Sequence, residues 1–104
     1  TKFNEKSTMK QRQSIIKQNI IATLRANEVK KAALFGSFVR GDFNKQSDID
    51  ILIEFKGRKS LLDLVQLKLQ LEKKIKRNID LITYNSLHPL LKEKILHEQE
   101  IMYE

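Results

Sequence analysis

Two aspartates spaced two residues apart are the side chains of this sequence best suited to chemistry. Asp48 and Asp50 lie in the segment DIDILIEF, whose alternation of polar and apolar residues predicts a β-strand. Successive strand residues point to opposite faces, so both carboxylates project from one side, with Cα atoms roughly 6.5–7 Å apart. Two ionised carboxylates this close repel one another unless a cation, a basic group or water compensates. Because all the donor atoms are oxygens, the pair predicts a Mg²⁺ site.

A third aspartate is placed to join this pair. Asp80 occupies the equivalent position in NIDLITY, a second segment with strand alternation. If the two strands are neighbours in a sheet, Asp80 lies beside Asp48 and Asp50 and adds a third carboxylate. The alternative is a solvated residue at the end of a strand, which would take no part in the chemistry.

A glycine and a serine follow another predicted strand, KKAALF. Gly36 lets backbone amides approach a phosphate closely, and the Ser37 hydroxyl adds a donor where a helical turn begins. Alone, this pair is typical of an ordinary turn, but its spacing to the aspartate pair favours a phosphate cradle next to a metal site. Arg40 and Lys45 lie in the intervening loop, and each either neutralises phosphate charge or is a solvated cation.

The surrounding sequence predicts the elements that must position these residues. Helical spacing of apolar residues predicts three helices, and alternation or short apolar runs predict three strands. The predicted helices cover residues 9–26, residues 61–75 and a segment after Ser86 that contains Pro89. One predicted strand ends at Phe35, and the other two cover residues 48–55 and 78–84. Ser60 and Asp63 form a capping box before the second helix. This order predicts an α/β (α+β) domain, a small mixed sheet flanked by helices.

The composition is that of one small globular domain. The 104 residues include 40% hydrophobic residues, 20 basic and 13 acidic residues, and the net charge is +7. We expect a single domain, 1–104, in which residues 1–8 form a flexible N-terminus. The sequence has no cysteine, membrane-length apolar run or signal peptide, so we expect a cytoplasmic protein without disulfides. Basic residues are spread along the chain without interleaved aromatics, which argues against direct nucleic-acid binding.

The Gly-Ser and Asp-x-Asp pairs together form a longer motif. G36-S37, ten intervening residues and D48-I49-D50 match the GSx10DxD signature of the polymerase-β-like nucleotidyltransferases. The minimal nucleotidyltransferase (MNT) subfamily is closely resembled by the segment GSFVRGDFNKQSDIDILIEF. The strand that carries the third carboxylate in that subfamily resembles NIDLIT, and its closing helix and tail resemble HPLLKEKILHEQEIMYE. Val39 stands where family members often have a smaller residue, which concerns packing in the loop rather than metal binding.

The resemblance implies a specific site and activity. It implies Mg²⁺, expected as two ions, and ATP bound between the Gly-Ser turn and the Asp strand of a polymerase-β-like fold. The implied catalytic and metal residues are Asp48, Asp50 and Asp80, and the nucleotide-binding residues are Gly36, Ser37, Arg40 and Lys45. MNT proteins are typically antitoxins encoded beside a HEPN-domain ribonuclease toxin, and some transfer AMP from ATP to a tyrosine of that toxin.

Other functions stay open at this point. The chain could transfer nucleotides to a small molecule or an RNA end, neutralise its partner by binding alone, or bind nucleic acid without catalysis. A chain of 104 residues has little room for a substrate-recognition region, so we expect an acceptor that brings its own surface, as a protein does. Candidates for a partner or homo-oligomer contact, with core packing as the commoner role, are Ile101, Met102 and Tyr103.

Overall fold

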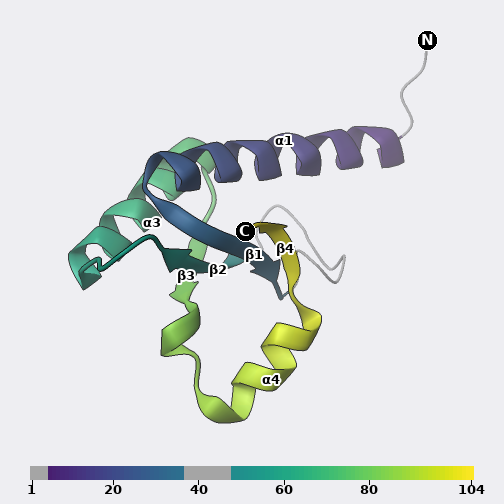
Figure 1. Ribbon diagram of the computed structural model, residues 1–104. Helices are drawn as coiled ribbons and strands as arrows, with labels where there is room; N and C mark the ends of the chain where they lie inside the picture. The colour runs from purple at the N-terminus through teal and green to yellow at the C-terminus, as the bar shows by residue number, and fades with distance from the viewer. Residues whose placement is uncertain (1–4, 37–47) are drawn as a thin grey trace.

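The computed structural model describes the backbone of residues 5–36 and 48–104. Within these ranges the chain forms three α-helices, one 3₁₀ turn and four strands (Figure 1). In chain order they are α1 (Glu5–Ala26), β1 (Val29–Phe35), β2 (Ile49–Phe55), α3 (Leu61–Ile75), β3 (Ile79–Thr83), η1 (Tyr84–Ser86), α4 (Pro89–Glu98) and β4 (Glu100–Tyr103). No helix in this part of the chain has the length and hydropathy needed to cross a membrane.

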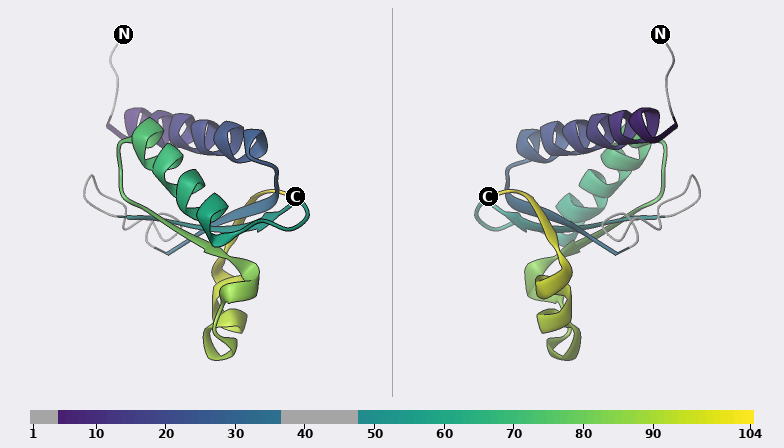
Figure 2. Two further views of the ribbon diagram at one scale, coloured as in Figure 1. Left: turned by 90° about the vertical axis from the view of Figure 1, so that its left-hand side faces the viewer. Right: turned by 90° about the vertical axis from the view of Figure 1, so that its right-hand side faces the viewer.

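The strands form one mixed sheet in the order β3-β2-β1-β4. β2 and β3 are parallel and are connected by α3, whereas β1 is antiparallel to both β2 and β4. Helices α1 and α3 cover one face of the sheet, and α4 projects on the other side (Figure 2). The predicted α/β architecture is confirmed. The two strands that carry Asp50 and Asp80, β2 and β3, are paired neighbours in the sheet, as considered from the sequence.

The core lies between the sheet and the two covering helices. Alternate residues of β2 point into it, and Ile49, Ile51 and Ile53 are fully buried there against α1 and α3. Because side chains alternate along a strand, Asp50 projects to the opposite face of the sheet. The burial of the apolar residues of β2 therefore directs the Asp50 carboxylate, a predicted catalytic group, away from the core.

Helix α3 begins and ends where the sequence predicts. The Ser60 hydroxyl accepts a hydrogen bond from the Asp63 N–H at 3.3 Å, and the Asp63 carboxylate accepts one from the Ser60 N–H at 2.8 Å. These bonds satisfy backbone donors that have no partner inside the helix. At the other end, Lys76 adopts a left-handed conformation (φ 62°) that stops the helix and turns the chain toward β3.

One helix start differs from the prediction, and the cap of another helix was not predicted. α1 begins at Glu5 rather than residue 9, so residues 5–8, expected to be part of a flexible N-terminus, are helical. α4 is capped by His88, whose Nδ1 accepts a hydrogen bond from the Leu90 N–H at 3.1 Å. An imidazole nitrogen thus replaces the hydroxyl or carboxylate oxygen that usually marks a helix start.

The C-terminal tail is a strand that packs on the core. Met102 and Tyr103 contact the core cluster, and the Tyr103 hydroxyl donates a hydrogen bond to the Val29 carbonyl at 2.8 Å. Ile101 points away and is 45% exposed. Of the three tail residues considered for a partner contact, Ile101 alone presents a largely exposed apolar side chain.

Candidate nucleotide and metal site

The sheet brings two of the three aspartates directly together. Asp50 of β2 is paired in register with Asp80 of the parallel strand β3. Residues that pair across neighbouring strands lie about 4.8 Å apart in the hydrogen-bonding direction. Asp50 is half-buried and Asp80 is exposed. The two carboxylates therefore start from adjacent points at the same end of the sheet.

Asp48 lies just before β2, beside the start of β3. The Ile49 N–H donates a hydrogen bond to the Asn78 carbonyl at 3.0 Å, which ties the two strand starts together. Arg77 lies close enough for the Asp48 charge to act on it: burial lowers the pKa of the guanidinium, and Asp48 raises it. Arg77 thus supplies positive charge beside an exposed carboxylate.

Sequence reasoning missed this role of Arg77. As sequence, the run KKIKR at 73–77 is typical of a charged helix end or of a surface for RNA or an acidic partner. In the fold, Arg77 follows the C-cap residue Lys76 and precedes β3, so it lies at the same end of the sheet as Asp48. No local pattern in the sequence indicates this position, because it follows from the pairing of β3 with β2, which begins two residues after Arg77.

Gly36 packs against the Asp50 carboxylate. Its φ is +74°, a conformation that side chains disfavour, and a Cβ atom added there would collide with the Asp50 Oδ2. The contact follows from the sheet register, since Phe35 of β1 pairs with Asp50 of the antiparallel β2. Only glycine leaves room for the chain to turn directly over the carboxylate.

Three other predicted site residues lie outside the described residues. These are the predicted nucleotide-binding residues Ser37, Arg40 and Lys45. Their participation stays a prediction from the sequence motif. The described part of the site consists of Gly36, the three aspartates and Arg77.

The donor chemistry of the aspartates suits Mg²⁺, which prefers carboxylate oxygens and retains several waters. Asp48 and Asp50 are two residues apart at the start of one strand, so a single ion would need only this pair together with water and phosphate oxygens. Within residues 5–36 and 48–104, no three acidic or histidine side chains gather into a group that could hold one ion. Asp80 therefore lies beside Asp50 in the sheet without completing a three-carboxylate cluster in this conformation.

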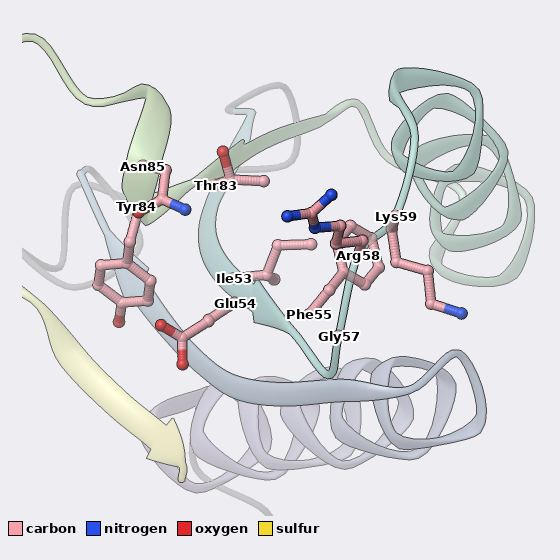
Figure 3. Close-up of a pocket in the computed structure, with 9 residues that line it drawn as sticks. All are labelled: Ile53, Glu54, Phe55, Gly57, Arg58, Lys59, Thr83, Tyr84 and Asn85. Carbon is pink, nitrogen blue, oxygen red and sulfur yellow. The ribbon is translucent and has the colours of Figure 1, made fainter.

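A pocket of about 390 Å³ lies at the other end of the same strand pair (Figure 3). From Asp50 to Phe55, β2 runs five residues, which is about 17 Å. The pocket is lined by residues of the β2 and β3 ends and of the segments that follow them: Ile53, Glu54, Phe55, Gly57, Arg58, Lys59, Thr83, Tyr84 and Asn85. This hollow is thus remote from the carboxylates.

Tyr84 borders this pocket in a structural role. Burial, followed by the negative charges of Glu104 and Glu54, raises the pKa of its hydroxyl to about 12. The hydroxyl donates a hydrogen bond to Gln99 Oε1 at 2.7 Å, and the Lys31 ammonium lies 4.9 Å from the ring centre. A hydroxyl that holds its proton this firmly is a poor nucleophile near neutral pH.

Residues 18–104 match the polymerase beta nucleotidyltransferase family. The match covers most of the chain and includes Gly36 and all three aspartates. The chain belongs to this family. Membership confirms the resemblance that the GSx10DxD spacing indicated, and it confirms that the chain is a nucleotidyltransferase rather than an unrelated α/β domain with acidic strand ends.

Curated relatives place the chain near the protein adenylyltransferases. A candidate protein adenylyltransferase of Methanocaldococcus jannaschii is 53% identical over 83 residues, which are 80% of this chain and 89% of that protein. The protein adenylyltransferase MntA of Thermococcus cleftensis is 36% identical over 70 residues, which are 67% of this chain and 71% of that protein.

Solved structures share the fold. A toxin–antitoxin complex with AMP-PNP contains a chain with a TM-score of 0.75 and 24% identity, over 84% of this chain and 72% of that chain. A complex of a tri-AMPylated Shewanella oneidensis HEPN toxin with an MNT antitoxin gives a TM-score of 0.71 and 22% identity, over 88% and 71% of the two chains. At these identities, the likeness concerns the fold.

Proposed function

We propose that this chain is a Mg²⁺-dependent protein adenylyltransferase that acts as an antitoxin. It transfers AMP from ATP to a hydroxyl, a tyrosine in our proposal, of a HEPN-domain ribonuclease toxin in the cytoplasm. The observation that carries this proposal is the packing of Gly36 against Asp50 beside Asp80, in a chain 53% identical to a candidate protein adenylyltransferase. Because Gly36 packs against a carboxylate, backbone amides that can bind a triphosphate lie next to carboxylate oxygens that can bind its metal ion.

In the proposed reaction, the acceptor hydroxyl oxygen attacks the α-phosphorus of ATP. A new oxygen–phosphorus bond forms, the bond to the β-phosphate bridging oxygen breaks, and pyrophosphate leaves. In our proposal Asp80, which is exposed and pairs in register with Asp50, accepts the hydroxyl proton. Asp48 and Asp50 would hold Mg²⁺, which when bound lowers the pKa of the attacking hydroxyl and neutralises triphosphate charge.

The remaining residues of the site bind and balance charge. Gly36 allows the chain to approach the triphosphate, and we expect Ser37, Arg40 and Lys45 to donate to its oxygens. The positive charge of Arg77 offsets the negative charge of Asp48, which reduces the repulsion among the carboxylates of the site. Support for ATP and for a HEPN partner comes from the similar folds seen with AMP-PNP and with an AMPylated HEPN toxin.

The test is a labelling experiment with the chain, Mg²⁺ and a purified HEPN-domain toxin. We expect label on the toxin from α-³²P ATP and none from γ-³²P ATP. The double variant Asp48→Asn/Asp50→Asn should lose the transfer, while Glu93→Gln on the exposed helix α4 should retain it. Transfer of γ label would identify a kinase instead. Neutralisation of the toxin that survives the double Asn variant would favour an antitoxin that works by binding alone.

A further inference from the structure

Helix α3 carries a second apolar row that the core does not use. Leu62, Val65 and Leu69, spaced i, i+3 and i+7, are 64%, 43% and 58% exposed. The buried row of the same helix contains Leu67 and Leu71, which lie on a different side of the helix. A helix that is apolar on both sides ordinarily has a partner on each.

We infer that this row, Leu62, Val65 and Leu69, is the docking surface for the acceptor protein of the proposed reaction. The inference rests on the proposed function for the identity of the partner. In the left view of Figure 2, α3 lies in front of the sheet with no other described element between it and the viewer. Because its three side chains are exposed, the row is accessible to a second molecule.

Charge around the row specifies the chemistry of that molecule. The stripe that begins with the apolar residues continues into Lys73, four residues after Leu69, and Lys76 follows as the C-cap residue of the helix. The two acidic side chains of α3 are already engaged: Asp63 accepts from the Ser60 N–H, and Glu72 accepts from the Ile79 N–H at 3.0 Å. The fitting occupant has apolar side chains followed by carboxylates.

The lysines of α3 are available to such a partner. Lys68, Lys73 and Lys74 are exposed, and none of them forms an ion pair within the described part of the chain. Contact with carboxylates would therefore form new ion pairs without breaking existing ones. Such pairs at the rim speed association and select the partner more than they add affinity.

The same charges disfavour a second copy of this chain as the occupant. If two α3 helices packed antiparallel about Val65, Lys73 of each would approach the N-terminal end of the other, which the basic residues Arg58 and Lys59 precede. If they packed parallel, Lys73 would face its own counterpart. Both arrangements place like charges in contact, in a chain with a net charge of +7.

The row also leads toward the site. Beyond Lys76 the chain passes through Arg77, which lies near Asp48, and enters β3 at Ile79, one residue before Asp80. A partner that lies along α3 with its acidic end at Lys73 and Lys76 therefore extends to the carboxylate edge. The exposed leucines of α4 have no comparable charge pattern, because Lys92 and Lys94 alternate there with glutamates.

The test measures binding and transfer separately. The α3 variant is Leu62→Gln/Leu69→Gln, the charge variant is Lys73→Glu, and the matched control is Leu90→Gln/Leu91→Gln on α4, where both leucines are exposed. Affinity for the purified HEPN-domain toxin is measured by calorimetry, AMP transfer by α-³²P label, and ATP affinity by fluorescence of a labelled nucleotide.

We expect the α3 variant to weaken toxin affinity at least tenfold and to raise the KM for the toxin, with kcat and ATP affinity unchanged. Lys73→Glu should weaken affinity several-fold and reduce its salt dependence, and the α4 control should stay within twofold of wild type. Wild-type affinity in the α3 variant, loss in the α4 control instead, or no toxin binding by wild type would overturn the inference.

The two proposals can fail separately. If wild type binds the toxin through α3 but transfers no AMP, the docking surface stands and the proposed reaction falls. If transfer proceeds with an unchanged KM in the α3 variant, the reaction stands and the docking surface falls. Sedimentation of the chain alone supplies the last control, because a wild-type dimer abolished by Leu62→Gln/Leu69→Gln would assign the row to a second copy and overturn the inference.

Discussion

The two ends of the parallel strand pair β2–β3 differ in shape and in chemistry. At one end, Asp50 and Asp80 pair in register and Gly36 presses against the Asp50 carboxylate. At the other end lies the 390 Å³ pocket, where Gly57 has the same left-handed conformation (φ +68°) but a Cβ atom added to it would meet nothing within 4 Å. The Asp50–Asp80 end is closely packed around carboxylates, and the other end contains a pocket.

In our proposal the nucleotide binds at the closely packed end, so the presence of a pocket does not mark the site. Ligands of open parallel sheets usually bind outside the carboxyl ends of the strands, which here is the pocket end. The antiparallel strand β1 changes that expectation, because its carboxyl end and Gly36 lie at the opposite end, beside the starts of β2 and β3. In our proposal, the packing of Gly36 against the Asp50 carboxylate marks the site instead.

The largest expected contrast between the ends is catalytic. Asp50→Asn should lower AMP transfer about a thousand-fold, equivalent to about 4 kcal/mol of barrier, because it removes a proposed metal ligand. Arg58→Gln, at the pocket end, should leave the rate within twofold of wild type. Initial rates with α-labelled ATP provide the comparison. Equal losses in the two variants would assign a part of the reaction to the pocket.

Saturating Mg²⁺ and ATP should stabilise the fold. At a hundred times its dissociation constant, a ligand contributes about 2.7 kcal/mol, which for a domain of this size raises Tm by about 10 °C. Differential scanning fluorimetry of wild type, Asp48→Asn/Asp50→Asn and Arg58→Gln measures the shift. We expect the Asn variant to lose it and the Gln variant to keep it. An unchanged Tm in wild type would count against a nucleotide site at the aspartates.

The two left-handed glycines offer a matched pair. Gly36→Ala adds a collision with Asp50 to the strain of positive φ and should cost about 2–3 kcal/mol of stability. Gly57→Ala adds strain alone and should cost about 1 kcal/mol. Denaturant unfolding measures both costs, and transfer should fall tenfold or more only in Gly36→Ala. Equal losses of stability and of transfer in the two variants would show that the packing of Gly36 against Asp50 has no particular role in the reaction.

The smallest effect concerns Tyr84 at the pocket end. Its pKa is raised from 10.0 to about 12, so the folded state favours the neutral hydroxyl. This contribution to stability is complete below pH 10 and is lost as the pH rises through 12. Absorbance at 295 nm should show a tyrosine that ionises near pH 12, absent in Tyr84→Phe, while transfer at pH 7.5 stays unchanged. A Tyr84 that ionises near pH 10 would contradict the buried environment.

Much of the fold follows from local signals in the sequence. Helix α3 is predictable at its observed bounds because the Ser60–Asp63 capping box and the apolar period agree. The start of α1 was missed because residues 5–8 are all polar and show no apolar period. The cap of α4 was missed because histidine is an uncommon helix cap, and Ser86 two residues earlier is a common one.

The site was predictable only in part, because part of it depends on strand pairing. The spacing of Gly36 to Asp48 and Asp50 is a local signal and indicated the family. The proximity of Arg77 to Asp48 arises from the parallel pairing of β2 and β3, which no local pattern encodes. The outward apolar row of α3 was likewise hidden, because a period cannot show which side of a helix the core will cover.

We propose that the nucleotide binds at the carboxylate end of the strand pair. Titration of the ¹⁵N-labelled chain with Mg²⁺ and AMP-PNP tests it most directly, with amide chemical shifts as the readout. We predict large shifts for Gly36, Asp50 and Asp80 and none beyond noise for Arg58 and Asn85. Shifts concentrated at the pocket end, with Gly36 and the aspartates unmoved, would contradict the account.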